Sequence, residues 1–192
     1  MSIDWALFKL ANGLAGHSLV LDTVIQMLMN DYALTTAIVL LLFALWFSGN
    51  TLEARERNQR AVLSAIAAVL LANLIVKACN LIFYRPRPFA YHEVTLLFYH
   101  PSDSSFPSNA ATVGFCFAAS IWGFNRKAGL LVYILACLLG FARVCGGVHY
   151  PSDILGGLLV GTASAWLIAK KFGFLDRLWT IIIHQLRRLL LA

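Results

Sequence analysis

The chain has 192 residues, of which 60% are hydrophobic and only 12% are charged, and its formal net charge is +6. Soluble domains are closer to half apolar and a quarter charged, so this composition excludes an ordinary soluble protein and predicts one integral membrane domain over residues 1–192. The basic residues border the apolar runs, which favours topology signals and contacts with membrane lipids over a nucleic-acid-binding surface.

The apolar runs predict an all-α membrane protein with six transmembrane helices and an amphipathic interfacial helix at each end. The interfacial helices are expected at 2–14 and 174–191. The six spans are expected at 17–30, 33–48, 61–83, 108–124, 128–144 and 152–169. Several spans are shorter than the roughly 20 residues that cross a bilayer, so flanking residues or local thinning of the bilayer must supply the rest.

The distribution of Lys and Arg predicts which connections face the cytoplasm. Ten of these residues lie in the connections 49–60 and 125–127 and in the C-terminal tail, whereas the opposite side holds three. The side richer in Lys and Arg is the cytoplasmic one. Both termini are then expected in the cytoplasm, and the loops 84–107 and 145–151 are expected to face outward together.

Two elements in or beside the loop 84–107 can bind an anion. Arg85 and Arg87 alternate with prolines and form a stiff cationic segment, which would also serve as a juxtamembrane anchor. Ser108 is a natural N-cap for the fourth span, and the free N–H groups of Asn109 and its neighbours favour an anion. An ordinary helix cap explains Ser108 equally well, so neither element identifies a site alone.

A third element places Arg143, His149 and Asp153 at intervals of six and four residues. A carboxylate beside an imidazole holds the ring in one tautomer and stabilises its charged form, and an Arg can bind a phosphate through two N–H groups. The pattern predicts a nucleophilic His that an Asp orients; the alternative is a polar loop between membrane helices. Three such elements predicted at one membrane face favour a site.

These motifs resemble a known family. Arg87-Pro88, Phe106-Pro107-Ser108 and Arg143-x5-His149-x3-Asp153 are similar to the three-part signature of the type 2 phosphatidic acid phosphatases. Within that family the chain looks most like the bacterial bacitracin-resistance-type undecaprenyl pyrophosphate phosphatases. The resemblance implies a polyprenyl pyrophosphate substrate and a multi-pass protein of the bacterial inner membrane, with its active site facing the periplasm.

The resemblance also implies roles for individual residues. His149 would be the nucleophile that forms a phosphohistidine, and Asp153 would orient it. No metal or other cofactor is implied, because cations and helix N–H groups take the place of a metal. The expected substrate-binding residues are Arg87, Arg143, Ser108, Asn109, Arg85 and Asn80.

The sequence departs from the family pattern at three positions. Asn80 stands where the family has a Lys, although Lys77 lies one helical turn earlier. Ala142 replaces the Ser before the Arg of the third motif. Ala110 stands at the position of the His that protonates the leaving group, and losing a general acid costs on the order of 10²–10⁴ in rate.

Three explanations of Ala110 stay open from the sequence. The chain can be an engineered inactive variant, or a natural homologue that is slow or has been repurposed. Alternatively His92 or His100, in the neighbouring loop, takes over the proton transfer; the simpler interpretation of both is a solvated loop histidine.

Two further functions also stay open. One is a phosphatase for another lipid phosphate, such as phosphatidylglycerophosphate, phosphatidic acid or lipid A. The other is a lipid-phosphate binding or transport protein without turnover. A purely structural membrane protein would leave the polar residues unexplained. The sequence predicts no oligomeric state.

Overall fold

The computed structural model describes residues 3–171 and 174–189, and over these residues it is all-helical, as predicted. The predicted terminal helices extend slightly beyond this, since residues 2 and 190–191 lie outside the described part. The helices are α1 (Ile3–Asn12), α2 (Leu19–Met29), α3 (Asp31–Phe47), α4 (Leu52–Ile82), α5 (Pro88–Tyr91), α6 (Asn109–Trp122), α7 (Arg126–Cys145), α8 (Pro151–Lys171) and α9 (Phe174–Arg188).

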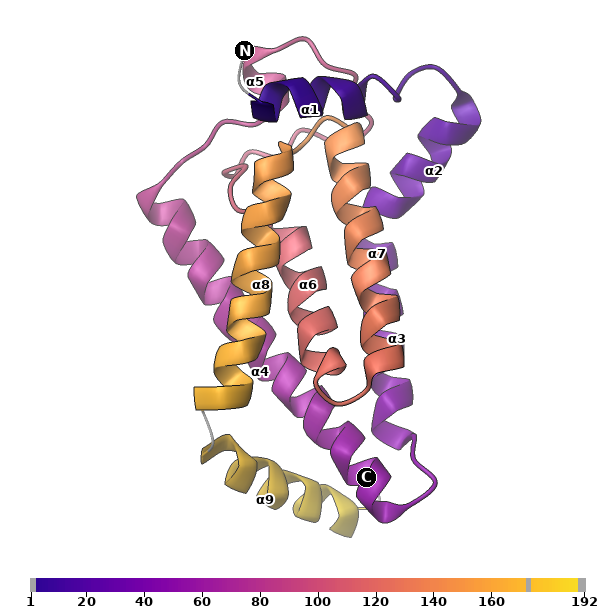
Figure 1. Cartoon of the computed structure of the whole chain (residues 1–192), viewed down its shortest axis with the longest axis vertical. Helices are drawn as coiled ribbons and strands as arrows, with labels where there is room; N and C mark the ends of the chain where they lie inside the picture. Colours follow the sequence, from indigo (N-terminus) through magenta and orange to yellow (C-terminus); the bar gives the residue numbers. More distant parts are fainter. Residues whose placement is uncertain (1–2, 172–173, 190–192) are drawn as a thin grey trace.

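Helix α6 occupies the middle of the bundle and packs against α4, α7 and α8 (Figure 1). Small residues on α8 allow its backbone to approach α6 closely. A Cβ atom on Gly157 would lie 2.9 Å from the carbonyl oxygen of Ser108, and one on Gly161 would overlap the carbonyl oxygen of Thr112. This close packing brings the N-terminal ends of α6 and α8 together, which is where the second and third sequence motifs lie.

Three helices, α4, α7 and α8, are long and apolar enough to cross a membrane, while α2, α6 and most of α3 form shorter apolar helices. These helices support the prediction of an integral membrane protein. The number of crossings, however, differs from the predicted six.

The first two predicted spans form one crossing rather than two. Helices α2 and α3 run in the same direction and meet at Asn30 (Figure 1). The Asn30 side chain accepts hydrogen bonds from the N–H groups of Tyr32 and Ala33 at 2.8 and 3.2 Å, so a new helix starts after a single extended residue. One residue cannot reverse the chain. Within residues 3–171 and 174–189 the chain therefore passes along the bundle five times: α2 with α3, α4, α6, α7 and α8.

An odd number of crossings places the two ends of the chain at opposite ends of the bundle. At one end, Asp4 of α1 is bonded to Arg85 and to Ser152. Toward the other end, the Trp179 indole N–H of α9 donates to the Ser64 hydroxyl in the first half of α4 at 3.2 Å. The structure thus places the two ends of the chain at opposite ends of the bundle, whereas the sequence analysis expected both termini on one side of the membrane.

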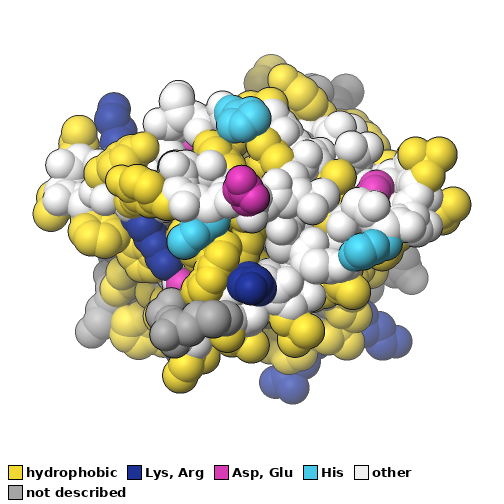
Figure 2. Space-filling view, turned by 90° about the horizontal axis from the view of Figure 1, so that it is seen from above, with side chains coloured by type: hydrophobic (Ala, Val, Ile, Leu, Met, Phe, Trp, Pro, Cys, Tyr) yellow, Lys and Arg dark blue, Asp and Glu magenta, His cyan; other side chains and the backbone are white. Residues whose placement is uncertain are grey.

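Helices α1 and α9 lie across opposite ends of the bundle (Figure 1). Viewed from the α1 end, acidic, basic and histidine side chains lie among hydrophobic ones (Figure 2). This end carries the motifs that the sequence analysis singled out.

Candidate active site

His149 lies in the short connection between α7 and α8, and its side chain is only 3% exposed. Its Nδ1 lies 3.0 Å from the carbonyl oxygen of Ser105, which can only accept a hydrogen bond. Its Nε2 lies 3.2 Å from Nη1 of Arg87, which can only donate one. Both neighbours therefore select the same neutral tautomer, with the proton on Nδ1 and a lone pair on Nε2.

Asp153 is fully buried in the first turn of α8, four residues after His149. Its Oδ2 lies 3.7 Å from Nδ1 of His149, too far for a direct hydrogen bond. The same oxygen accepts the Ser105 hydroxyl at 2.5 Å and the Tyr150 N–H at 2.7 Å. Ser105 thus connects the carboxylate to the ring, because its carbonyl accepts from His149 and its hydroxyl donates to Asp153.

Arg87 is buried beside the reactive nitrogen of His149. Its Nη1 also donates to the carbonyl of Val148 at 3.0 Å, and its Nη2 pairs with the Asp103 carboxylate at 2.8 Å. Arg143, from the last turn of α7, is buried as well and lies over the Phe98 ring, with its Cζ 4.7 Å from the ring centroid. Arg87 and Arg143 therefore place two buried guanidinium groups near His149.

A cavity of about 310 Å³ joins these groups. The side chains of His149, Arg87 and Arg143 line it together, as do Asn109 and Ala110 at the start of α6. Its remaining wall includes apolar residues from α3, α6 and α7. The cavity therefore combines a polar end that suits a phosphate with an apolar wall that suits a lipid.

Ser108 belongs to the scaffold of the site rather than to the cavity lining. Its hydroxyl accepts the N–H of Ala111 at 3.5 Å and so caps α6, and its own N–H donates to the carbonyl of Asp153 at 3.1 Å. The peptide bond between Phe106 and Pro107, just before it, is cis. Ser108 thus fixes the start of α6 against the start of α8.

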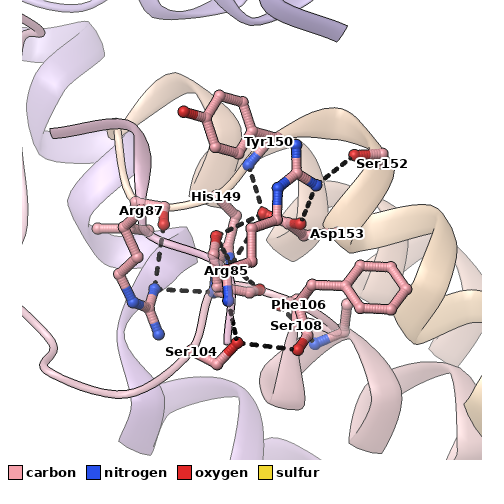
Figure 3. A network of polar contacts seen from close by, with 12 residues as sticks. Arg85, Arg87, Ser104, Phe106, Ser108, His149, Tyr150, Ser152 and Asp153 are labelled. Carbon is pink, nitrogen blue, oxygen red and sulfur yellow. Dashed lines mark hydrogen bonds and ion pairs between the residues drawn. The ribbon is translucent and has the colours of Figure 1, made fainter. Parts of the chain in front are cut away.

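Two predicted substrate-binding residues lie apart from this cavity. Arg85 bonds Asp153 and Ser152, on the opposite side of His149 from Arg87 (Figure 3). Asn80 lines a neighbouring cavity of about 410 Å³ together with Lys77. Asp103 lines both cavities, so the two are adjacent.

The two histidines considered as replacements for a general acid do not line the cavity. His92 stacks on Trp5 with ring centroids 3.8 Å apart, and His100 meets Phe89 edge-on at 4.9 Å. Both are exposed loop residues. The explanation that one of them replaces the missing acid therefore finds no support in this arrangement.

Three residues of the site escaped the sequence analysis: Ser105, Asp103 and Asp4. Ser105 directly precedes the Phe106-Pro107-Ser108 motif, so its position beside that motif could have indicated a role in the site. Asp103 lies two residues further upstream. Asp4 meets Arg85 across 81 residues of sequence, and no local pattern announces such a contact.

Burial lowers the pKa of His149 below its ordinary value of 6.5. The nearby Asp153 carboxylate acts in the opposite direction, while the positive charges of Arg87 and Arg143 lower the pKa further. The imidazole is therefore neutral at neutral pH, with its lone pair available. Among the described residues, no group of three His, Cys, Asp or Glu side chains is placed to hold a metal ion.

Comparison with known proteins gives a consistent picture. The family model described as "PAP2 superfamily" matches residues 61–177. Undecaprenyl-diphosphatase BcrC of Bacillus subtilis is 35% identical over 97% of this chain and 96% of its own length. Lipid A 1-phosphatase of Rhizobium johnstonii is 35% identical over 62% of this chain and 53% of its own length. The crystal structure of Aquifex aeolicus LpxE superimposes with a TM-score of 0.68 at 27% identity, covering 88% of this chain and 96% of that one.

Proposed function

Because this chain belongs to the PAP2 superfamily, we propose that it is a membrane phosphatase that converts undecaprenyl pyrophosphate to undecaprenyl phosphate. The observation that carries the proposal is the cavity in which the neutral Nε2 of His149 faces two buried arginines. The relative that matches almost the whole chain is named for this substrate. The chain would act as one domain, over residues 1–192, in the bacterial plasma membrane.

In the first step, the Nε2 lone pair of His149 attacks the terminal phosphorus of the diphosphate. An N–P bond forms, the P–O bond to the bridging oxygen breaks, and the lipid phosphate leaves with the electron pair. Arg87 and Arg143 hold the oxygens of the transferring group and stabilise their charge. The ring gains positive charge, which the Ser105 carbonyl and the Asp153 carboxylate stabilise from the Nδ1 side.

In the second step, water attacks the phosphorus of the phosphohistidine. A new P–O bond forms and the N–P bond breaks, which returns the electron pair to Nε2. The protons of the water remain with inorganic phosphate and the solvent. The two arginines stabilise the same phosphoryl oxygens as before, so one arrangement serves both steps.

Ala110 favours a diphosphate over a phosphate ester. The oxygen that leaves a diphosphate belongs to a phosphate group, whose second pKa is about 6, so it departs at neutral pH without help. The oxygen that leaves a phosphate monoester becomes an alkoxide with a pKa near that of water, about 16, and needs a proton. Ala110 lines the cavity and has no proton to give.

In the proposed orientation, the end of the protein that carries the cavity lies at the outer face of the cytoplasmic membrane. The connections 49–60 and 125–127 and the C-terminal tail carry ten of the 15 Lys and Arg residues. Moving the N-terminal helix to the opposite side adds only Lys9 there, so the balance still places the tail in the cytoplasm. The N-terminus is then outside, together with His149.

Phosphate release tests the proposal. The purified chain, in detergent or vesicles, is given undecaprenyl pyrophosphate, phosphatidylglycerophosphate, phosphatidic acid or lipid A. We expect release from the diphosphate above the level of a His149→Ala control, and slower release from the three others. A rapid reaction with a different lipid would correct the substrate, and no His149-dependent release from any lipid would refute the function.

The alternative is a lipid-phosphate binding protein without turnover, and the observation that favours it is Ala110 in the cavity wall. This alternative predicts saturable binding of the lipid diphosphate without phosphate release. It also predicts that release stays absent in the Ala110→His variant, whereas the phosphatase proposal predicts release there.

A further inference from the structure

Arg85 forms ion pairs with two carboxylates at once, and its side chain does not line the cavity. Its Nη1 lies 2.6 Å from Oδ1 of Asp153, and its Nη2 lies 2.7 Å from Oδ2 of Asp4. The guanidinium also lies over the ring of Tyr150, with its Cζ 4.2 Å from the centroid. Figure 3 shows this guanidinium beside Asp153 and Ser152, away from Arg87.

Asp4 is itself held by the start of α8. Its carboxylate accepts the Ser152 N–H at 2.9 Å and the Ser152 hydroxyl at 2.6 Å. Burial opposes ionisation of Asp4, but the bonds from Ser152 and Arg85 outweigh it and hold the pKa of Asp4 below its ordinary value. Phe8, also on α1, packs against Tyr150 in the same region. Helix α1 is therefore docked on the active-site end by both polar and apolar contacts.

The buried side chain of Asp153 depends on this arrangement for its polar partners. A carboxylate with no solvent exposure is costly unless a cation and hydrogen-bond donors surround it. His149 is neutral and 3.7 Å away, so it does not supply the cation. Arg85 does, at 2.6 Å, while Ser105 and Tyr150 satisfy the other carboxylate oxygen.

We propose that Arg85 and Asp4 are positioning residues of the active site: Arg85 pairs with Asp153 and keeps it oriented toward Ser105 and His149, and Asp4 of α1 holds Arg85 in place. In this role Arg85 acts on the nucleophile His149 through Asp153, and not on the substrate. The N-terminal helix then becomes part of the catalytic assembly. The proposal rests on the proposed phosphatase function.

The first test separates positioning from substrate binding. Neither Arg85 nor Asp4 lines the cavity, so Arg85→Gln and Asp4→Asn should lower kcat by about 10- to 100-fold, through a misplaced nucleophile. Their KM should stay within about twofold. Asp4→Glu, which keeps the charge, should recover most of the loss, and Glu93→Gln, an exposed carboxylate at the same end, should have no effect.

The second test needs no turnover. Calorimetry measures the binding of inorganic phosphate, a ground-state ligand, and of orthovanadate, which mimics the transition state and bonds to the nucleophile. We expect Arg85→Gln and Asp4→Asn to weaken vanadate binding by at least about tenfold while phosphate binding changes little. Arg87→Gln should weaken both. Size-exclusion profiles and melting curves in detergent identify any variant that fails to fold, in which case the milder Asp4→Asn decides.

Two results would overturn the proposal. A raised KM and weaker phosphate binding in Arg85→Gln would return Arg85 to the substrate site. A folded Asp4→Asn protein that matches Glu93→Gln in kcat and in vanadate binding would remove α1 from the assembly. Failure of the proposed function looks different: the unmodified chain and Ala110→His would then release no phosphate and bind no vanadate, and the positioning role would fall with it.

Discussion

Ala110 is the residue whose identity decides how the leaving group departs. Ala110→His should place a proton donor in the cavity wall. We expect kcat for a lipid monophosphate to rise by about 10²–10⁴, because an alkoxide needs the proton, and kcat for the diphosphate to rise less. Phosphate release at saturating lipid measures both. Equal gains on the two substrates would contradict the leaving-group argument, and His149→Ala in the same background should abolish either gain.

The protonation of His149 predicts the acidic side of the pH profile. Burial lowers the pKa of His149 below 6.5, and only the neutral ring can attack. The value of kcat/KM should therefore hold steady as the pH falls through 6.5 and decrease only below it, as the ring gains a proton. Initial rates between about pH 4 and 8 measure this. An acidic limb centred above 6.5 would mean that Asp153 outweighs burial and the two arginines.

Among the helices, α6 and α8 pack with the least space between their backbones. A Cβ atom on Gly161 would overlap the backbone of α6 at Thr112, so Gly161→Ala should destabilise the protein by about 1–3 kcal/mol. Melting temperature in detergent measures the loss. Gly123→Ala is the matched control, because its Cβ would lie 3.6 Å from the Ser120 carbonyl oxygen, an ordinary van der Waals distance. A Gly161→Ala protein as stable as this control would show that the two helices can separate at little cost.

For the whole molecule, five crossings predict that the two terminal helices face different compartments. Single cysteines at the exposed positions Glu93 and Gln185, in a background without the four native cysteines, report on the two ends. A membrane-impermeant maleimide added to intact cells should label Glu93→Cys but not Gln185→Cys. Labelling of both, or of neither, would contradict opposite ends, and the reverse pattern would invert the orientation.

The sequence indicated which residues to consider for the candidate site, but not how they are arranged relative to one another. His149 and Asp153 are only four residues apart in the sequence, so their proximity could be expected from their spacing. Their linkage through Ser105 depends on how the loop before α6 folds back, which no periodicity encodes. Arg85 looked like a phosphate ligand because its charge was visible, whereas its partner Asp4 was 81 residues away.

The predicted six spans differ from the five passes along the bundle for a related reason. Hydropathy identifies apolar stretches but carries no direction, so α2 and α3 counted as two spans. The decisive feature was one side chain: Asn30 caps the helix that follows it and lets the chain continue in the same direction. One crossing fewer then moved the N-terminus to the other end of the bundle.

The bonds of Asp4 also set an order of events during synthesis. Asp4 leaves the ribosome first, but Arg85 follows 81 residues later and Ser152 148 residues later. Since a chain grows from its N-terminus, α1 has no complete docking site until the start of α8 has emerged. The enzyme is therefore assembled by its last crossing: a nascent chain that stalls before residue 149 lacks both His149 and the Ser152 groups that complete the docking of α1, and it should release no phosphate.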